Sequence, residues 1–192
     1  APGEAWTVVG HSLGGKVAML LALTAPELVQ RLCVVDIAPK GYGDLHRFGG
    51  YIAEMLRLPL GSLGARRSEA EAAFAEDDPG VKAFLLQNLR RDGDTWRWQH
   101  NLDLVAADAA LGPGSRIAGF PVVPGTVEPY RGRVLWLVGG RSAYVTPEDD
   151  ATMRALFPRV REVTVNGASH WVHTDAPEVV IESLRRFLHT SP

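Results

Sequence analysis

Residues 7–17 read TVVGHSLGGKV, and this stretch decides the fold. A β-branched run enters Gly-x-Ser-x-Gly, and an apolar segment typical of a helix follows at once. The pattern predicts a strand, a sharp turn and a helix, with Ser12 in a strained conformation and its hydroxyl raised above a sheet. A Cβ at Gly10 or Gly14 is expected to collide with neighbouring backbone, and Gly15 to continue the close approach of helix to strand. Ser12 is therefore the candidate nucleophile.

The predicted helix directs its N-terminal amides toward Ser12, so the backbone N–H of Leu13 is the candidate donor to an oxyanion.

A rival interpretation uses the same residues. Residues 10–16 also fit the first part of a phosphate-binding loop, G-x-x-x-x-G-K, between a strand and a helix. That loop needs Ser or Thr at its next position to hold Mg²⁺, and Val17 has no oxygen. The strand at 32–36 could imitate the acidic half of a nucleotide site, but the serine turn is favoured.

Composition limits the classes of partner. The chain has 192 residues with 46% hydrophobic content, which suits one domain with a real core, and its formal net charge is -2. The chain has no excess of basic residues, so nucleic acid is not an expected partner. No apolar run approaches the roughly 20 residues of a membrane span. The single cysteine, Cys33, lies in an apolar strand pattern and is expected to be a buried hydrophobe. It agrees with a reducing compartment, either cytoplasm or an organellar matrix, and no targeting segment is visible.

The order of the segments predicts one α/β domain, 1–192, with a mostly parallel sheet. Continuous apolar runs at 32–37 and 134–140 are typical of strands covered on both faces, and 160–165 is expected to form a further strand. An amphipathic helix is expected at 177–188. Between the strands, 41–128 shows several helical segments, one of them beginning near Ser68 as a cap, and is interpreted as a helical cap. The core is then 1–40 and 129–192.

Two further side chains complete a candidate hydrolytic site. Asp36 follows a strand next to the nucleophile strand, and His170 follows the last strand, at the sheet edge where such sites lie. A hydroxyl needs an imidazole to activate it, and the order nucleophile, acid, base is that of the α/β-hydrolases. His173 is the competing base, whereas His11 is too close to Ser12 in sequence. Asp175 has capping-box spacing to Glu178 and is expected to cap a helix.

Five motifs in order resemble one subfamily of the α/β-hydrolases, which comprises bacterial short acyl-chain esterases and the mitochondrial abhydrolase-domain-containing protein 11 type. They are GHSLGGK at 10–16, VVDIAP at 34–39, WR followed by NLD at 101–103, GGRSAYV at 139–145 and GASHWVH at 167–173. The resemblance implies a three-layer serine esterase or thioesterase with a helical cap, a small-molecule acyl ester or thioester as substrate, no cofactor and no metal. It also implies that several N-terminal strands, and the loop with a second oxyanion donor, are missing here.

The acid departs from the usual pattern of the superfamily. The position that often carries Asp after the Gly-Gly pair holds Arg141-Ser142, and a serine cannot neutralise an imidazolium. The resemblance favours Asp36 instead, with Ser142 supporting it by a hydrogen bond. Asp103 and Asp108 are weaker alternatives. The resulting hypothesis is a Ser12, His170 and Asp36 triad that cleaves acyl esters through an acyl-enzyme. The alternative is a non-catalytic fragment or interaction module with an exposed sheet edge. The oligomeric state stays open.

Overall fold

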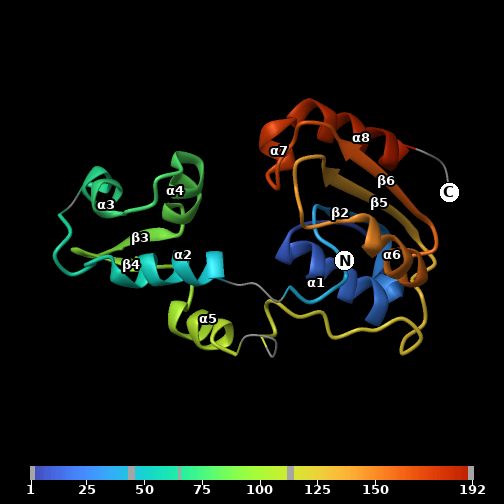
Figure 1. The fold of residues 1–192 in the computed structure, drawn as a ribbon, viewed down its shortest axis with the longest axis horizontal. Helices are drawn as coiled ribbons and strands as arrows, with labels where there is room; N and C mark the ends of the chain where they lie inside the picture. Colours follow the sequence, from blue (N-terminus) through green and yellow to red (C-terminus); the bar gives the residue numbers. More distant parts are fainter. Residues whose placement is uncertain (1–2, 43–45, 65, 112–114, 190–192) are drawn as a thin grey trace. The chain divides into compact units, whose positions relative to one another are not determined.

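The computed structural model describes residues 3–42, 46–64, 66–111 and 115–189. The chain forms two compact units, the first from residues 1–40 and 120–192 and the second from residues 41–119. The first unit is therefore built from an N-terminal segment, drawn blue in Figure 1, and a C-terminal segment, drawn yellow to red.

The first unit is built on a four-stranded parallel sheet with the order β1-β2-β5-β6. Its strands are β1 (Trp6–His11), β2 (Val29–Val35), β5 (Arg133–Gly139) and β6 (Val160–Val165). Its α-helices are α1 (Leu13–Thr24), α6 (Asp150–Leu156), α7 (Val172–Asp175) and α8 (Pro177–His189). The 3₁₀ turns η1 (Pro26–Leu28) and η3 (Pro147–Asp149) precede β2 and α6. The segments 32–37, 134–140 and 160–165 therefore contain parallel strands, as the sequence predicts.

Helices cover both faces of this sheet. On one face, alternate residues of β2 and β5 form a buried cluster with Val180 and Phe187 of α8. On the other face, Gly15 of α1 approaches Val34, and the ring of Trp136 lies 5.6 Å from that of Phe157, the residue after α6. Figure 1 shows α8 and α1 on opposite sides of the strands. Successive strand side chains point to opposite faces, so burial on both faces explains the apolar runs of β2 and β5.

The register of the sheet brings its carboxyl ends together. His11 at the end of β1 is paired with Val35, and Val35 is paired with Leu137 of β5. Gly139, where β5 ends, is paired with Val165, where β6 ends. The residues that follow these four strands therefore lie along one edge of the sheet, where open α/β folds carry their sites.

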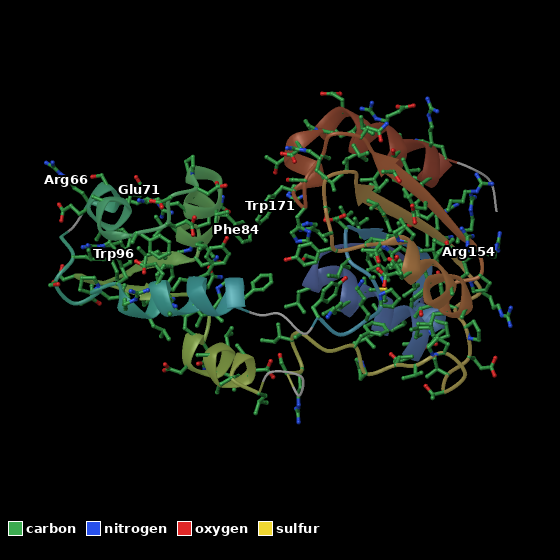
Figure 2. The ribbon with its side chains drawn as sticks, viewed as in Figure 1. Arg66, Glu71, Phe84, Trp96, Arg154 and Trp171 are labelled. Atoms are coloured by element: carbon green, nitrogen blue, oxygen red, sulfur yellow. The ribbon has the colours of Figure 1, made fainter. Side chains whose placement is uncertain are left out.

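The second unit has its own hydrophobic core. It contains the helices α2 (His46–Arg57), α3 (Arg67–Ala73), α4 (Pro79–Leu86) and α5 (Leu102–Ala109), and an antiparallel hairpin of β3 (Leu89–Asp92) and β4 (Thr95–Trp98). Trp96, labelled in Figure 2, is buried in this core, and its Nε1–H donates to the Gly64 carbonyl at 2.8 Å. Trp98 donates to the Met55 carbonyl at 2.9 Å. These aromatic rings therefore stabilise the unit itself.

Local capping in the second unit differs partly from expectation. Ser68 does not cap α3, because the helix begins one residue earlier, with Arg66 at the capping position. At the start of α4, Asp78 caps the helix, since its carboxylate accepts from the amides of Gly80 and Val81. In the described part of the chain, no helix has both the length and the apolar character needed to cross a bilayer.

Candidate active site

Ser12 occupies the sharp turn between β1 and α1. Its backbone has φ 53° and ψ -124°, a left-handed conformation that a residue with a side chain rarely adopts. The turn is held because the Ser12 amide donates to the Val35 carbonyl at 3.0 Å and the Gly15 amide donates to the Ser12 carbonyl at 2.8 Å. Leu13 is the first residue of α1, so its N–H belongs to the helix-end amides without an intrahelical partner. The turn thus has the strained geometry that the sequence predicts.

The turn depends on Gly10 and Gly15, as the sequence predicts, but not on the absence of a side chain at Gly14. A Cβ at Gly10 would lie 2.3 Å from the Gly14 carbonyl oxygen, and a Cβ at Gly15 would lie 2.6 Å from Cγ2 of Ile37. The prediction for Gly14 is wrong, because a Cβ there would meet no atom within 4 Å. The backbone of Gly14 is the obstacle for Gly10, whereas its own Cβ direction points into open space.

Asp36 follows β2 and is fully buried. It also has a positive φ, 51°, and its amide donates to the Leu137 carbonyl at 2.8 Å, which fixes it beside β5. Its Oδ1 accepts the Gly139 amide at 2.8 Å, and its Oδ2 accepts the Ser142 hydroxyl at 2.5 Å and His170 Nδ1 at 2.8 Å. Three donors from two other segments therefore hold this carboxylate in one orientation.

His170 lies between Asp36 and Ser12. Because a carboxylate accepts and cannot donate, the His170 Nδ1–H donates to Asp36. In the neutral imidazole, Nε2 is then the acceptor, and it lies 3.0 Å from Oγ of Ser12. The His170 side chain keeps 18% of its surface exposed. The structure thus brings together the three residues that the sequence selects, Ser12, Asp36 and His170. The Asp108 carboxylate accepts the Ser115 hydroxyl at 2.5 Å.

The loop that carries His170 packs against the end of β5 and is hydrogen-bonded to Asp175. A Cβ at Gly139 would lie 2.2 Å from the Ser169 carbonyl oxygen, so the end of β5 and this loop approach as closely as backbones can. Oδ2 of Asp175 accepts the Ser169 amide at 2.7 Å and the Ser169 hydroxyl at 2.6 Å, and the bonds from Ser169 hold the pKa of Asp175 below its ordinary value. The helix-cap prediction for Asp175 is therefore wrong, because its carboxylate anchors the loop before His170.

Two neighbours of His170 were not selected from the sequence. The ring of Tyr144 stacks on the His170 ring, with centroids 4.0 Å apart and planes at 25°. His11 Nε2 lies 2.8 Å from the His170 carbonyl oxygen. His11 lies in the motif GHSLGGK and Tyr144 in GGRSAYV, so membership in these motifs is the sequence feature that points to both residues. His11 is too close to Ser12 in sequence to be its base, but its ring reaches the backbone carbonyl of His170. His173, the competing base, contacts the ring of His11 at 4.9 Å.

Other reactive side chains near the turn are buried. Lys16 is 4% exposed, and burial lowers its pKa to about 8. A phosphate-loop lysine must reach its phosphates, so this burial argues against the nucleotide interpretation. Burial also raises the pKa of the Cys33 thiol to about 12, which keeps it protonated and unreactive at neutral pH. Within the described ranges, no cluster of His, Cys, Asp and Glu has a metal-binding arrangement.

The chain is similar in sequence to known lipases and esterases. The chain is 38% identical to the mouse sn-1-specific diacylglycerol lipase ABHD11 over 186 residues, which are 94% of this chain and 58% of that protein. It is 30% identical to esterase YbfF of Escherichia coli strain K12, over 95% of this chain and 67% of that protein.

Among solved structures, a marine microorganism esterase superposes with a TM-score of 0.85 at 29% identity, covering 96% of this chain and 70% of that one. This similarity confirms the predicted α/β-hydrolase fold. The chain spans less than two thirds of the length of the ABHD11 relatives that it matches. A family model described as the alpha/beta hydrolase family matches residues 1–183. The chain belongs to the alpha/beta hydrolase family.

Proposed function

We propose that this chain hydrolyses carboxylic esters or thioesters of acyl substrates, with Ser12 as nucleophile, His170 as general base and Asp36 as the acid that orients it. The observation that supports this most is the continuous hydrogen-bond chain from Ser12 Oγ through both ring nitrogens of His170 to Asp36. Its distances of 3.0 and 2.8 Å lie within the range for proton transfer between a nucleophile and its base.

In the first half of the reaction, Oγ of Ser12 attacks the acyl carbonyl and Nε2 of His170 takes the hydroxyl proton. Positive charge develops on the imidazole, and the Asp36 carboxylate stabilises it through Nδ1–H. Negative charge develops on the carbonyl oxygen, and the Leu13 amide at the start of α1 donates to it. The imidazolium then protonates the leaving alcohol or thiol, and the acyl group remains on Ser12.

In the second half, water replaces the leaving group. His170 takes a proton from that water, the resulting hydroxide equivalent attacks the acyl-enzyme carbonyl, and the same imidazolium returns the proton to Ser12 Oγ as the acid departs. Ser142 assists without touching the substrate, because its hydroxyl donates to the same Asp36 oxygen that accepts from His170. The Gly139 amide on Oδ1 fixes the other half of the carboxylate.

The names of the relatives support an ester as the substrate class. One is a diacylglycerol lipase and others are esterases. All of these cleave, by their names, an acyl group from an oxygen, and the proposed chemistry is the same for a sulfur leaving group. We therefore propose a small-molecule acyl ester or thioester as substrate.

Hydrolysis of nitrophenyl acyl esters tests the proposal. We expect saturable turnover of acetate, butyrate and octanoate esters, with a rapid initial release of nitrophenol equal to the enzyme concentration when deacylation is slow. A parallel series of S-acyl thioesters determines whether sulfur is accepted. A folded sample, judged by a cooperative thermal transition, that releases no product from either series would contradict the proposal.

A further inference from the structure

His11 connects the strand that presents Ser12 to the loop that carries His170. It is the last residue of β1, and its Nε2 lies 2.8 Å from the His170 carbonyl oxygen. A carbonyl only accepts, so Nε2 of His11 must donate. Burial lowers the pKa of His11, which favours the neutral imidazole with its single proton on the nitrogen that faces the carbonyl.

The ring of His11 also packs against the segment around His170. Its centroid lies 4.7 Å from that of His170, 4.9 Å from that of His173 and 5.7 Å from that of Trp171. Trp171 is labelled in Figure 2 and follows His170 directly in the chain. One side chain of β1 therefore contacts three rings of a segment that is about 160 residues away in sequence.

The other supports of this loop act elsewhere. Asp175 accepts from the Ser169 amide, and Asp36 accepts from Nδ1 of the His170 ring. His11 holds the backbone of His170 itself, and it is covalently next to Ser12. This hydrogen bond therefore ties the backbone of the base to the residue directly before the nucleophile.

We propose that His11 is a positioning residue for the acyl transfer described above, because its Nε2–H fixes the His170 backbone and thereby the distance from His170 Nε2 to Ser12 Oγ. This inference rests on the proposed function. A displacement of about 1 Å in a reacting group can cost about 100-fold in rate. The effect belongs in kcat, since His11 orients the base and is not assigned a substrate contact.

Three substitutions separate the hydrogen bond from the ring. His11→Ala removes both, His11→Phe keeps an aromatic ring without a donor, and His11→Gln keeps a donor of similar reach. We expect kcat for nitrophenyl butyrate to fall about 10- to 100-fold in the Ala and Phe variants, with KM within about twofold of the original. The Gln variant should remain within about threefold in kcat. His173→Ala, which removes a ring contact to His11 and leaves the bond to the carbonyl, should remain within about twofold.

Equal kcat in all variants would overturn the inference. It would also be overturned if His11→Gln were as slow as His11→Ala, or if His173→Ala lowered kcat as much as His11→Ala. Imidazole ¹⁵N spectra provide a readout that does not need turnover. We expect the Nε2–H tautomer for His11, and His170 ring signals that move in His11→Ala and are retained in His11→Gln. Unchanged His170 signals in His11→Ala would also overturn the inference. Absence of turnover in the unmodified chain would count against the proposed function alone, and the spectra would still decide the role of His11.

Discussion

Ser12→Ala is expected to lower kcat for a short acyl ester by at least about 10⁴-fold while the protein stays folded. Without Oγ no acyl-enzyme can form, and the residual rate comes from the remaining groups acting on bound substrate. The turn should survive, because the backbone bonds that hold residue 12 are made by its amide and carbonyl, to Val35 and from Gly15. Initial rates and a thermal melt on the same preparation measure both parts of the prediction.

A matched control for this variant is Ser68→Ala. Ser68 lies in α3 of the second unit and has no assigned role in the proposed reaction. Its substitution should leave kcat and KM within about twofold. Retained turnover in Ser12→Ala would remove Ser12 from the mechanism, and an equal loss in Ser68→Ala would mean that the assay reports folding and not chemistry.

Asp36→Asn is expected to lower kcat by about 10³- to 10⁴-fold. An amide carries no charge to stabilise the imidazolium, and an amide NH₂ turned toward Nδ1 would favour the tautomer that cannot accept the Ser12 proton. The carboxylate is also fully buried and accepts from Gly139 and Ser142, so an inserted NH₂ group would face existing donors. Steady-state kinetics measure the loss in kcat, and circular dichroism checks that the fold is retained.

Asp103→Asn and Asp108→Asn are the comparison variants for this prediction. Asp103 lies in the first turn of α5, and its substitution should change kcat by less than about twofold. Asp108 accepts from the Ser115 hydroxyl and from the amides of Arg116 and Ile117, so its substitution should lower the stability of the second unit more than it changes kcat at low temperature. Losses equal to that of Asp36→Asn in either variant would mean that the acid of the triad is another residue.

Local chemistry made much of the first unit predictable. The central strands β2 and β5 are short runs of mostly buried apolar residues. The strained serine turn has a specific glycine requirement, so residues 7–17 alone predict the order strand, turn and helix. Order along the chain then placed Asp36 and His170 at the same edge of the sheet, because parallel strands end together. The structure brings these residues within hydrogen-bonding distance.

Features that depend on packing were harder to predict. Whether Gly10 or Gly14 must lack a side chain depends on the angle at which α1 leaves the turn, and the sequence does not contain that angle. Asp175 has the spacing of a helix cap, but its carboxylate accepts from the amide and hydroxyl of Ser169, which packing brings close. The sequence shows only that His11 is next to Ser12 and cannot easily reach its hydroxyl. The hydrogen-bond partner of His11 is the carbonyl of His170, which is far away in sequence.

Labelling of the intact chain with a serine-reactive fluorophosphonate tests the central claim most directly. An activated serine is required for this reaction, so the account predicts one phosphonyl group per chain, located by peptide mass spectrometry on Ser12, and no label in Ser12→Ala or after denaturation. A folded chain that remains unlabelled, or a label on any other residue, would contradict the account.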